Sequence, residues 1–188
     1  MNGKNHLVTG AVLAVDGALA LRASPSFQPV RELLSPAARY GADPAGWAML
    51  ALCGALYLFG TVLPDVDNGG MASRWLHFSL PLAHRGWTHS VWAMGLVFVL
   101  GHWFWPAVYI GLGMLAHDLM DSPSAAGWCP FYPLGRYRIY KGTVMKRGWT
   151  PGLYSSSRPG SEAVFAAVIV GASVLGWLFL GYLYLCDV

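Results

Sequence analysis

Residues 163–185 read AVFAAVIVGASVLGWLFLGYLYL, an apolar run without a single charged side chain. A helix needs about 20 apolar residues to cross the hydrocarbon core of a bilayer, and this run is long enough. Tyr182 and Tyr184 near its end are typical of the membrane–water interface. The run therefore predicts a membrane-spanning helix, and it decides the fold class.

The composition of the whole chain agrees with a membrane protein. Of 188 residues, 55% are hydrophobic and only 11% are charged, whereas soluble domains carry about 25% charged residues. This length indicates one domain over residues 1–188. Cys53, Cys129 and Cys186 lie far apart without a C-x-x-C pair, so they are expected to act as apolar filling rather than as a thiolate site.

Four more apolar segments precede the last one. The stretch from Val91 to Met120 is too long for one span and is divided at Pro106, because proline suits the first turn of a new helix. The first segment contains Asp16, which is a functional candidate by default, or else a protonated acid or one bonded to a neighbouring helix. The predicted fold is all-α, an integral membrane bundle of about five helices. The segments before 163–185 are Leu7–Leu21, Trp47–Leu63, Val91–Trp105 and Pro106–Met120.

Five spans place most basic residues on one side of the membrane. Arg22, Arg31 and Arg39 fall on the other side. By the positive-inside rule the basic side is cytoplasmic, although an anionic substrate would also draw cations to it. The basic residues on that side are Lys4, Arg74, Arg85, Arg136, Arg138, Lys141, Lys146, Arg147 and Arg158.

Most of the residues able to bind a metal fall at this same end of the segments. His117 and Asp121 are four apart and share a helix face, and Asp65 and Asp67 follow the helix-breaking Pro64. If these residues had unrelated roles, they would be distributed over both ends of the segments. We therefore expect a metal cluster of two or three ions at the cytoplasmic helix ends. Imidazole with carboxylate suits Zn²⁺, with Mn²⁺ or Fe²⁺ as alternatives. The candidate ligands are His6, Asp65, Asp67, His84, His89, His117, Asp121 and Glu162.

Taken singly, several of these residues have simpler interpretations. His6 alone could be an interfacial anchor, and the Asp65–Asp67 stretch could be an ordinary turn. Glu162 could cap the last helix, where a carboxylate is favourable. The joint placement, rather than any one residue, supports the metal cluster.

Four stretches carry a resemblance to a known family. In this order they resemble the membrane-bound metal-dependent hydrolases, whose named bacterial members are the LexA-regulated, YdjM-like proteins of the inner membrane. The H-R-G-x-T-H-S block is the most specific of them. The stretches are NHLVTG (5–10), LPDVDN (63–68), AHRGWTHS (83–90) and GMLAHDLMDSPSAAG (113–127).

That family is in turn similar to zinc-dependent phospholipase C and to the related single-strand nucleases, in which helices surround three zinc ions. The resemblance implies that the ligands are His6, Asp65 or Asp67, His84, His117 and Asp121, with His89 and Glu162 as additions. Those soluble enzymes use a second His-x-x-x-Glu pair. Here Arg158 stands four residues before Glu162, a departure at the third metal position.

The favoured prediction is a hydrolase that cleaves a phosphoester of a membrane lipid or lipid-linked substrate. Two metals about 3.5–4 Å apart would activate a water, and Asp65 or Asp67 would orient it or act as the base. Predicted phosphate contacts are Arg85, Arg136, Arg138 and Arg158. The alternatives are an ion or metal transporter, a non-catalytic protein with a structural metal site, and a nuclease acting on nucleic acid.

Overall fold

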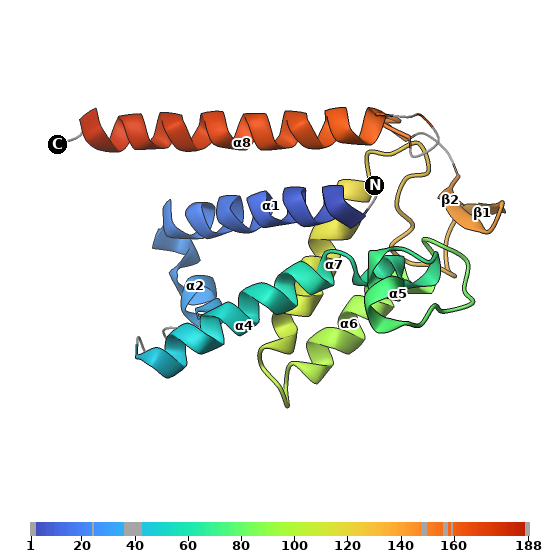
Figure 1. The fold of residues 1–188 in the computed structure, drawn as a ribbon, viewed down its shortest axis with the longest axis horizontal. Helices are drawn as coiled ribbons and strands as arrows, with labels where there is room; N and C mark the ends of the chain where they lie inside the picture. Colours follow the sequence, from blue (N-terminus) through green and yellow to red (C-terminus); the bar gives the residue numbers. More distant parts are fainter. Residues whose placement is uncertain are drawn as a thin grey trace.

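The computed structural model describes residues 3–23, 25–35, 43–147, 150–155, 158 and 160–186, and these are mostly helical. The α-helices are α1 (Gly3–Ala23), α2 (Gln28–Leu34), α4 (Pro44–Gly60), α5 (Met71–Leu76), α6 (Val91–Leu100), α7 (Ala107–Asp121) and α8 (Ser161–Cys186) (Figure 1). Short 3-10 helices cover Pro25–Phe27, Leu63–Asp67 and Trp87–His89, and the strands are β1 (Tyr137–Tyr140) and β2 (Thr143–Lys146).

Each of the five predicted apolar segments contains a helix, so that part of the fold prediction is confirmed. The third segment ends early, at Leu100 rather than Trp105, because the chain turns over the residues before Pro106. The described residues are mostly helical, as the all-α prediction states, and they add one feature that was not predicted, the antiparallel hairpin of β1 and β2. Its two-residue turn, Lys141–Gly142, has φ of 48° and 76°. Positive φ at both positions is what a tight hairpin turn requires.

One helix in the described part of the chain, α8, is long and apolar enough to cross a membrane. Its window Ser161–Leu178 is only 6% buried, while α4 and α6 are apolar but shorter. The five-span topology and its orientation therefore stay predictions. Arg39 lies outside the described residues.

Two glycines let α4 and α7 touch along their backbones. A Cβ on Gly113 would lie 2.1 Å from the carbonyl oxygen of Tyr57, and one on Gly60 would lie 2.3 Å from that of Ile110. Any other residue would force the helices apart. The contact brings Thr61, directly after α4, against the last turns of α7.

Helix α1 lies between α8 and α4 in the ribbon (Figure 1). A polar contact joins α1 to α8, since Asp16 accepts hydrogen bonds of 2.7 Å from Ser173 Oγ and from Trp177 Nε1. Asp16 is thus bonded to a neighbouring helix, one of the alternatives raised by the sequence. The contact packs α1 against α8.

Candidate metal centre

Segments far apart in the sequence deliver buried histidines and aspartates to one place. They are the start of α1, the 3-10 turn after α4, the loop before α6 and the end of α7. Three groups there have ligand atoms within 4.8 Å of one another. The groups are His6 with His117 and Asp121, Asp65 with His84 and His89, and His89 with His117 and Asp118. Because His89 and His117 each belong to two groups, the three form one continuous cluster.

The hydrogen bonds around His117 fix which of its nitrogens carries the proton. Its Nδ1 lies 2.8 Å from the carbonyl oxygen of Thr61, which can only accept. The proton is therefore on Nδ1, and Nε2 presents a lone pair. A backbone carbonyl bonded to one imidazole nitrogen is the usual support of a histidine whose other nitrogen binds a metal.

The same reasoning applies to His89. The Thr88 hydroxyl donates to the Asp67 carboxylate, so its oxygen accepts from His89 Nδ1, which is 3.0 Å away. His89 Nε2 then also presents a lone pair. Burial lowers the pKa of His89 to about 3, so the ring is neutral at neutral pH.

Two imidazole lone pairs therefore face each other. His89 Nε2 and His117 Nε2 are 3.1 Å apart, and both side chains are buried. Two lone pairs at this separation repel unless a cation lies between them. Nitrogens bound to one Zn²⁺ at about 2.0–2.1 Å in a tetrahedron lie about 3.3 Å apart, so the spacing fits two ligands of one ion.

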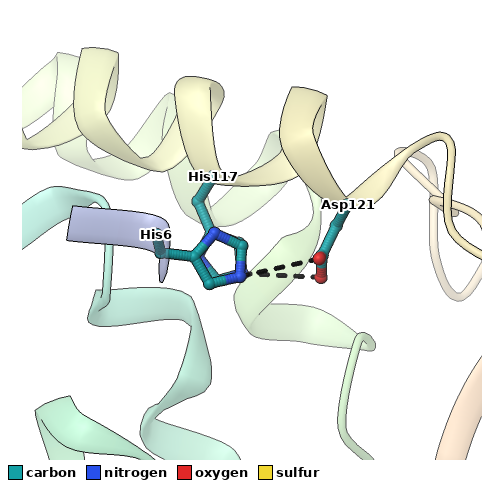
Figure 2. Close-up of side chains that lie close together, drawn as sticks. All are labelled: His6, His117 and Asp121. Carbon is teal, nitrogen blue, oxygen red and sulfur yellow. Dashed lines mark ion pairs between the residues drawn. The ribbon is translucent and has the colours of Figure 1, made fainter. Parts of the chain in front are cut away.

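His6 stacks on His117, with ring centroids 3.8 Å apart and an angle of 20° between the planes (Figure 2). Among the residues that the structure describes, neither ring nitrogen of His6 has a hydrogen-bond partner, although the side chain is fully buried. His6 Nε2 lies 3.6 Å from Asp121 Oδ1, and His117 Nε2 lies 3.6 Å from Asp121 Oδ2. Unpartnered buried nitrogens beside a carboxylate fit metal ligands well.

Asp65 and Asp67 take different positions. Asp65 Oδ1 lies 3.9 Å from His84 Nε2, 3.7 Å from His89 Nε2 and 3.8 Å from His117 Nε2. This one oxygen faces three ring nitrogens. Asp67 instead bonds His84 Nδ1 at 2.8 Å and accepts from Thr88. Asp65 thus has the position of a shared ligand, and Asp67 that of a residue that orients His84.

Asp118 joins the cluster although it was not among the predicted ligands. Its side chain is fully buried, and neither carboxylate oxygen has a hydrogen-bond partner in the described part of the chain. The prediction relied on the i,i+4 spacing of His117 and Asp121, which places Asp118 on another helix face. That face meets His89, which comes from a distant loop. The available signal was its position in the same helical turn as two candidate ligands.

Arg85 is buried, and its guanidinium holds the outer side of the cluster. Its Nη2 lies 2.8 Å from Asp121 Oδ2, and its Nη1 donates to Ser124 Oγ at 2.6 Å and to the Gly127 carbonyl at 3.3 Å. The Tyr154 hydroxyl lies 2.9 Å from Asp121 Oδ1. One oxygen of Asp121 thus contacts Arg85 and the other contacts Tyr154, while each also faces a histidine.

The sequence matches the YdjM inner membrane protein family over residues 1–186, which is nearly the whole chain. The chain belongs to this family. No curated protein and no solved structure matches it. The membership supports a membrane protein, as the apolar segments predicted.

The remaining predicted site residues of this YdjM family protein lie outside the three groups. Glu162 is half-buried in the first turn of α8, and Arg158 is exposed just before it. Arg136 and Arg138 are exposed on and beside the β1–β2 hairpin. The structure brings together the predicted histidines with Asp65 and Asp121, but not these four.

Proposed function

We propose that this YdjM family protein is a membrane-bound, metal-dependent hydrolase that cleaves the phosphoester of a lipid or lipid-linked substrate. The observation that carries the metal site is the 3.1 Å approach of two buried nitrogens, His89 Nε2 and His117 Nε2, that both present lone pairs. Zn²⁺ suits the mixed imidazole and carboxylate set, with Mn²⁺ or Fe²⁺ as alternatives.

The three groups indicate which residues would hold the ions. The central group is His89, His117 and Asp118, flanked by His6 with Asp121 on one side and Asp65 with His84 on the other. This supports two or three ions. A bound divalent metal would supply an activated water and polarise a phosphoryl oxygen.

The protein's own groups have separate tasks in this proposal. Asp65 Oδ1, which faces three imidazoles, would hold the ions as a shared ligand and so orient the attacking water. Asp67 is occupied by His84 and Thr88, so it is a positioning residue rather than the base. Arg85 keeps Asp121 ionised and fixed.

The exposed edge of the cluster supports a lipid phosphoester as the substrate. The His84 side chain is 21% exposed, whereas those of His6, His89 and His117 are buried. Backbone hydrogen bonds join His84 to the hairpin, between His84 N and Gly142 O and between Val144 N and His84 O. That hairpin carries exposed cations, including Arg138, which suit the phosphate of a lipid headgroup.

A second candidate function is a structural metal site. The burial of almost every ligand favours it, because a structural site is closed whereas a catalytic one keeps an open position. The ions would then join α1, α7 and the two loops without chemistry. The site is catalytic if a substrate reaches the exposed edge of His84, and structural if none does.

The test begins with metal analysis of the purified protein and of His117→Ala and Asp65→Ala, with His77→Ala as the matched control outside the cluster. We expect bound metal in the wild type and the control, and a loss in the two variants. Phospholipids, polyprenyl phosphates and nucleic acids are then assayed with and without chelator. Full metal occupancy without hydrolysis of any phosphoester would favour the structural site.

A further inference from the structure

The segment between α7 and α8 has an extreme charge balance. No acidic residue occurs between Asp121 and Glu162, whereas half of the twelve basic residues of the chain lie there. The segment leads directly into α8, the helix that is long enough to cross a membrane. Its basic residues are Arg136, Arg138, Lys141, Lys146, Arg147 and Arg158.

Within this segment, the hairpin exposes large apolar side chains beside the cations. Ile139 is 55% exposed and Tyr140 is 59% exposed, at the end of β1 next to the turn. Lys141 Nζ lies 5.6 Å from the centroid of the Tyr140 ring. Phe131 and Leu134, in the loop before β1, are also exposed. Aromatic and aliphatic groups mixed with Lys and Arg are typical of elements that lie in the headgroup region of a bilayer.

The hairpin is also firmly attached to the protein. Its backbone bonds the loop that carries His84, through His84 N to Gly142 O at 2.8 Å and Val144 N to His84 O at 2.7 Å. Lys146 N donates to Ala126 O at 3.0 Å, close after α7. Both strands lie at the end of the molecule where α8 begins (Figure 1). The exposed surface is therefore held at the place where a spanning α8 would leave the membrane.

We propose that the hairpin 137–146 binds the anionic headgroup surface of the leaflet at which α8 begins. Ile139 and Tyr140 lie among the headgroups, and the neighbouring arginines and Lys141 contact lipid phosphates. Because the hairpin is bonded to the backbone of His84, this contact holds the open edge of the metal cluster at the lipid surface. The binding itself does not depend on a metal or on hydrolysis.

An anionic membrane fits this surface better than a nucleic acid does. The aliphatic side chains of Ile139 and Leu134 have no counterpart on a phosphate backbone, but they match the acyl–headgroup boundary. The basic segment also leads into α8, the helix that is long enough to cross a membrane, which favours a lipid surface as well.

The test uses the full chain in nanodiscs of phosphatidylcholine alone or of phosphatidylcholine with phosphatidylglycerol. Backbone hydrogen exchange over residues 131–147 is followed by mass spectrometry. We expect slower exchange in the anionic discs, and loss of the difference at high salt, which screens exposed charges. Lys141→Gln should weaken the binding equilibrium about fivefold, the effect of one cation at an anionic surface. Arg74→Gln, an exposed cation in α5, is the matched control and should leave it unchanged.

Ile139→Ser tests the apolar contribution separately and should also reduce the protection in anionic discs. Equal exchange in the two lipids would overturn the proposal, as would protection that neither Lys141→Gln nor Ile139→Ser reduces. Protection by a single-stranded oligonucleotide in phosphatidylcholine discs, without protection by anionic lipid, would identify a nucleic-acid surface instead. Metal content is measured on the same samples, so a failure of the metal site is seen independently.

Discussion

Arg85 Nη2 lies 2.8 Å from Asp121 Oδ2, and both side chains are buried. This ion pair joins the loop before α6 to the last turn of α7. On its other side Asp121 faces His6 and His117, each at 3.6 Å. A carboxylate that is held from outside and directed at imidazoles has the arrangement of a supported metal ligand.

Replacement of Arg85 should therefore damage both the fold and the metal site. Arg85→Gln leaves the buried charge of Asp121 uncompensated, which is expected to destabilise the protein by about 3–5 kcal/mol. Loss of the support should weaken metal binding by about 10–100-fold. Thermal unfolding and metal titration measure the two effects.

Arg138→Gln is the control, because Arg138 is exposed and should change neither quantity. The sequence predicted Arg85 as a phosphate contact. If that role is the main one, Arg85→Gln will keep both stability and metal affinity and will raise only the KM for a phosphoester. That outcome would refute the positioning role.

Replacement of Asp118 should change the melting temperature in opposite directions with and without metal. Its carboxylate is fully buried, and no described residue forms a hydrogen bond with it. In the chelator-treated protein Asp118→Ala removes an unsatisfied buried group and should raise the melting temperature. In the metal-loaded protein it removes a ligand and should lower both metal content and melting temperature. A change in the same direction under both conditions would exclude Asp118 as a ligand.

Replacement of either histidine that is shared between two groups should remove more metal than replacement of the other two cluster histidines. His89 and His117 each belong to two groups of potential ligands, whereas His6 and His84 belong to one. His89→Ala or His117→Ala should remove more metal per protein than His6→Ala or His84→Ala. His77 and His102 are exposed outside the cluster, so their alanine variants should keep full content. Equal losses from all four cluster variants would mean one cooperative site rather than overlapping ones.

Replacement of Asp65 should reduce metal binding more than replacement of Asp67. Asp65→Asn weakens an oxygen that faces three imidazoles, and we expect loss of bound metal. Asp67→Asn disturbs only the orientation of His84 and Thr88, which should reduce metal affinity by about 10–100-fold without abolishing it. Metal titration ranks the two variants by affinity. If Asp67→Asn loses more metal than Asp65→Asn, then Asp67 is the ligand and Asp65 the positioning residue.

The sequence predicted the helices, because apolar length is a pattern along the chain, and it placed several histidines and aspartates at one end of them; that they bind metal stays a prediction. Apolar length located the five segments. A common end for His6, His84 and His117 followed from threading those segments through a membrane. The cluster that the structure forms contains all three.

Other features depend on contacts that no linear pattern encodes. Arg85 was expected to face substrate, but its backbone has φ of 61° and its side chain is buried against Asp121. The hairpin was missed because its turn is Lys-Gly rather than the commoner Asn-Gly or Asp-Gly. Whether Asp65 or Asp67 faces the imidazoles depends on a short 3-10 turn.

The last prediction concerns Asp16, which lies far along α1 from His6. It accepts hydrogen bonds of 2.7 Å from Ser173 and Trp177 of α8. Hydrogen bonds to a charged group contribute about 1.5–3 kcal/mol, so Asp16→Leu should lower the unfolding free energy while metal content stays unchanged. Ser173→Ala and Trp177→Phe remove the two bonds singly. A double-mutant cycle with Asp16 should show coupling of about 0.5–3 kcal/mol for each. The transporter alternative predicts the opposite pattern, in which Asp16→Asn abolishes ion flux in proteoliposomes but leaves stability unchanged. That result would show that Asp16 serves an ion pathway and not the contact between α1 and α8.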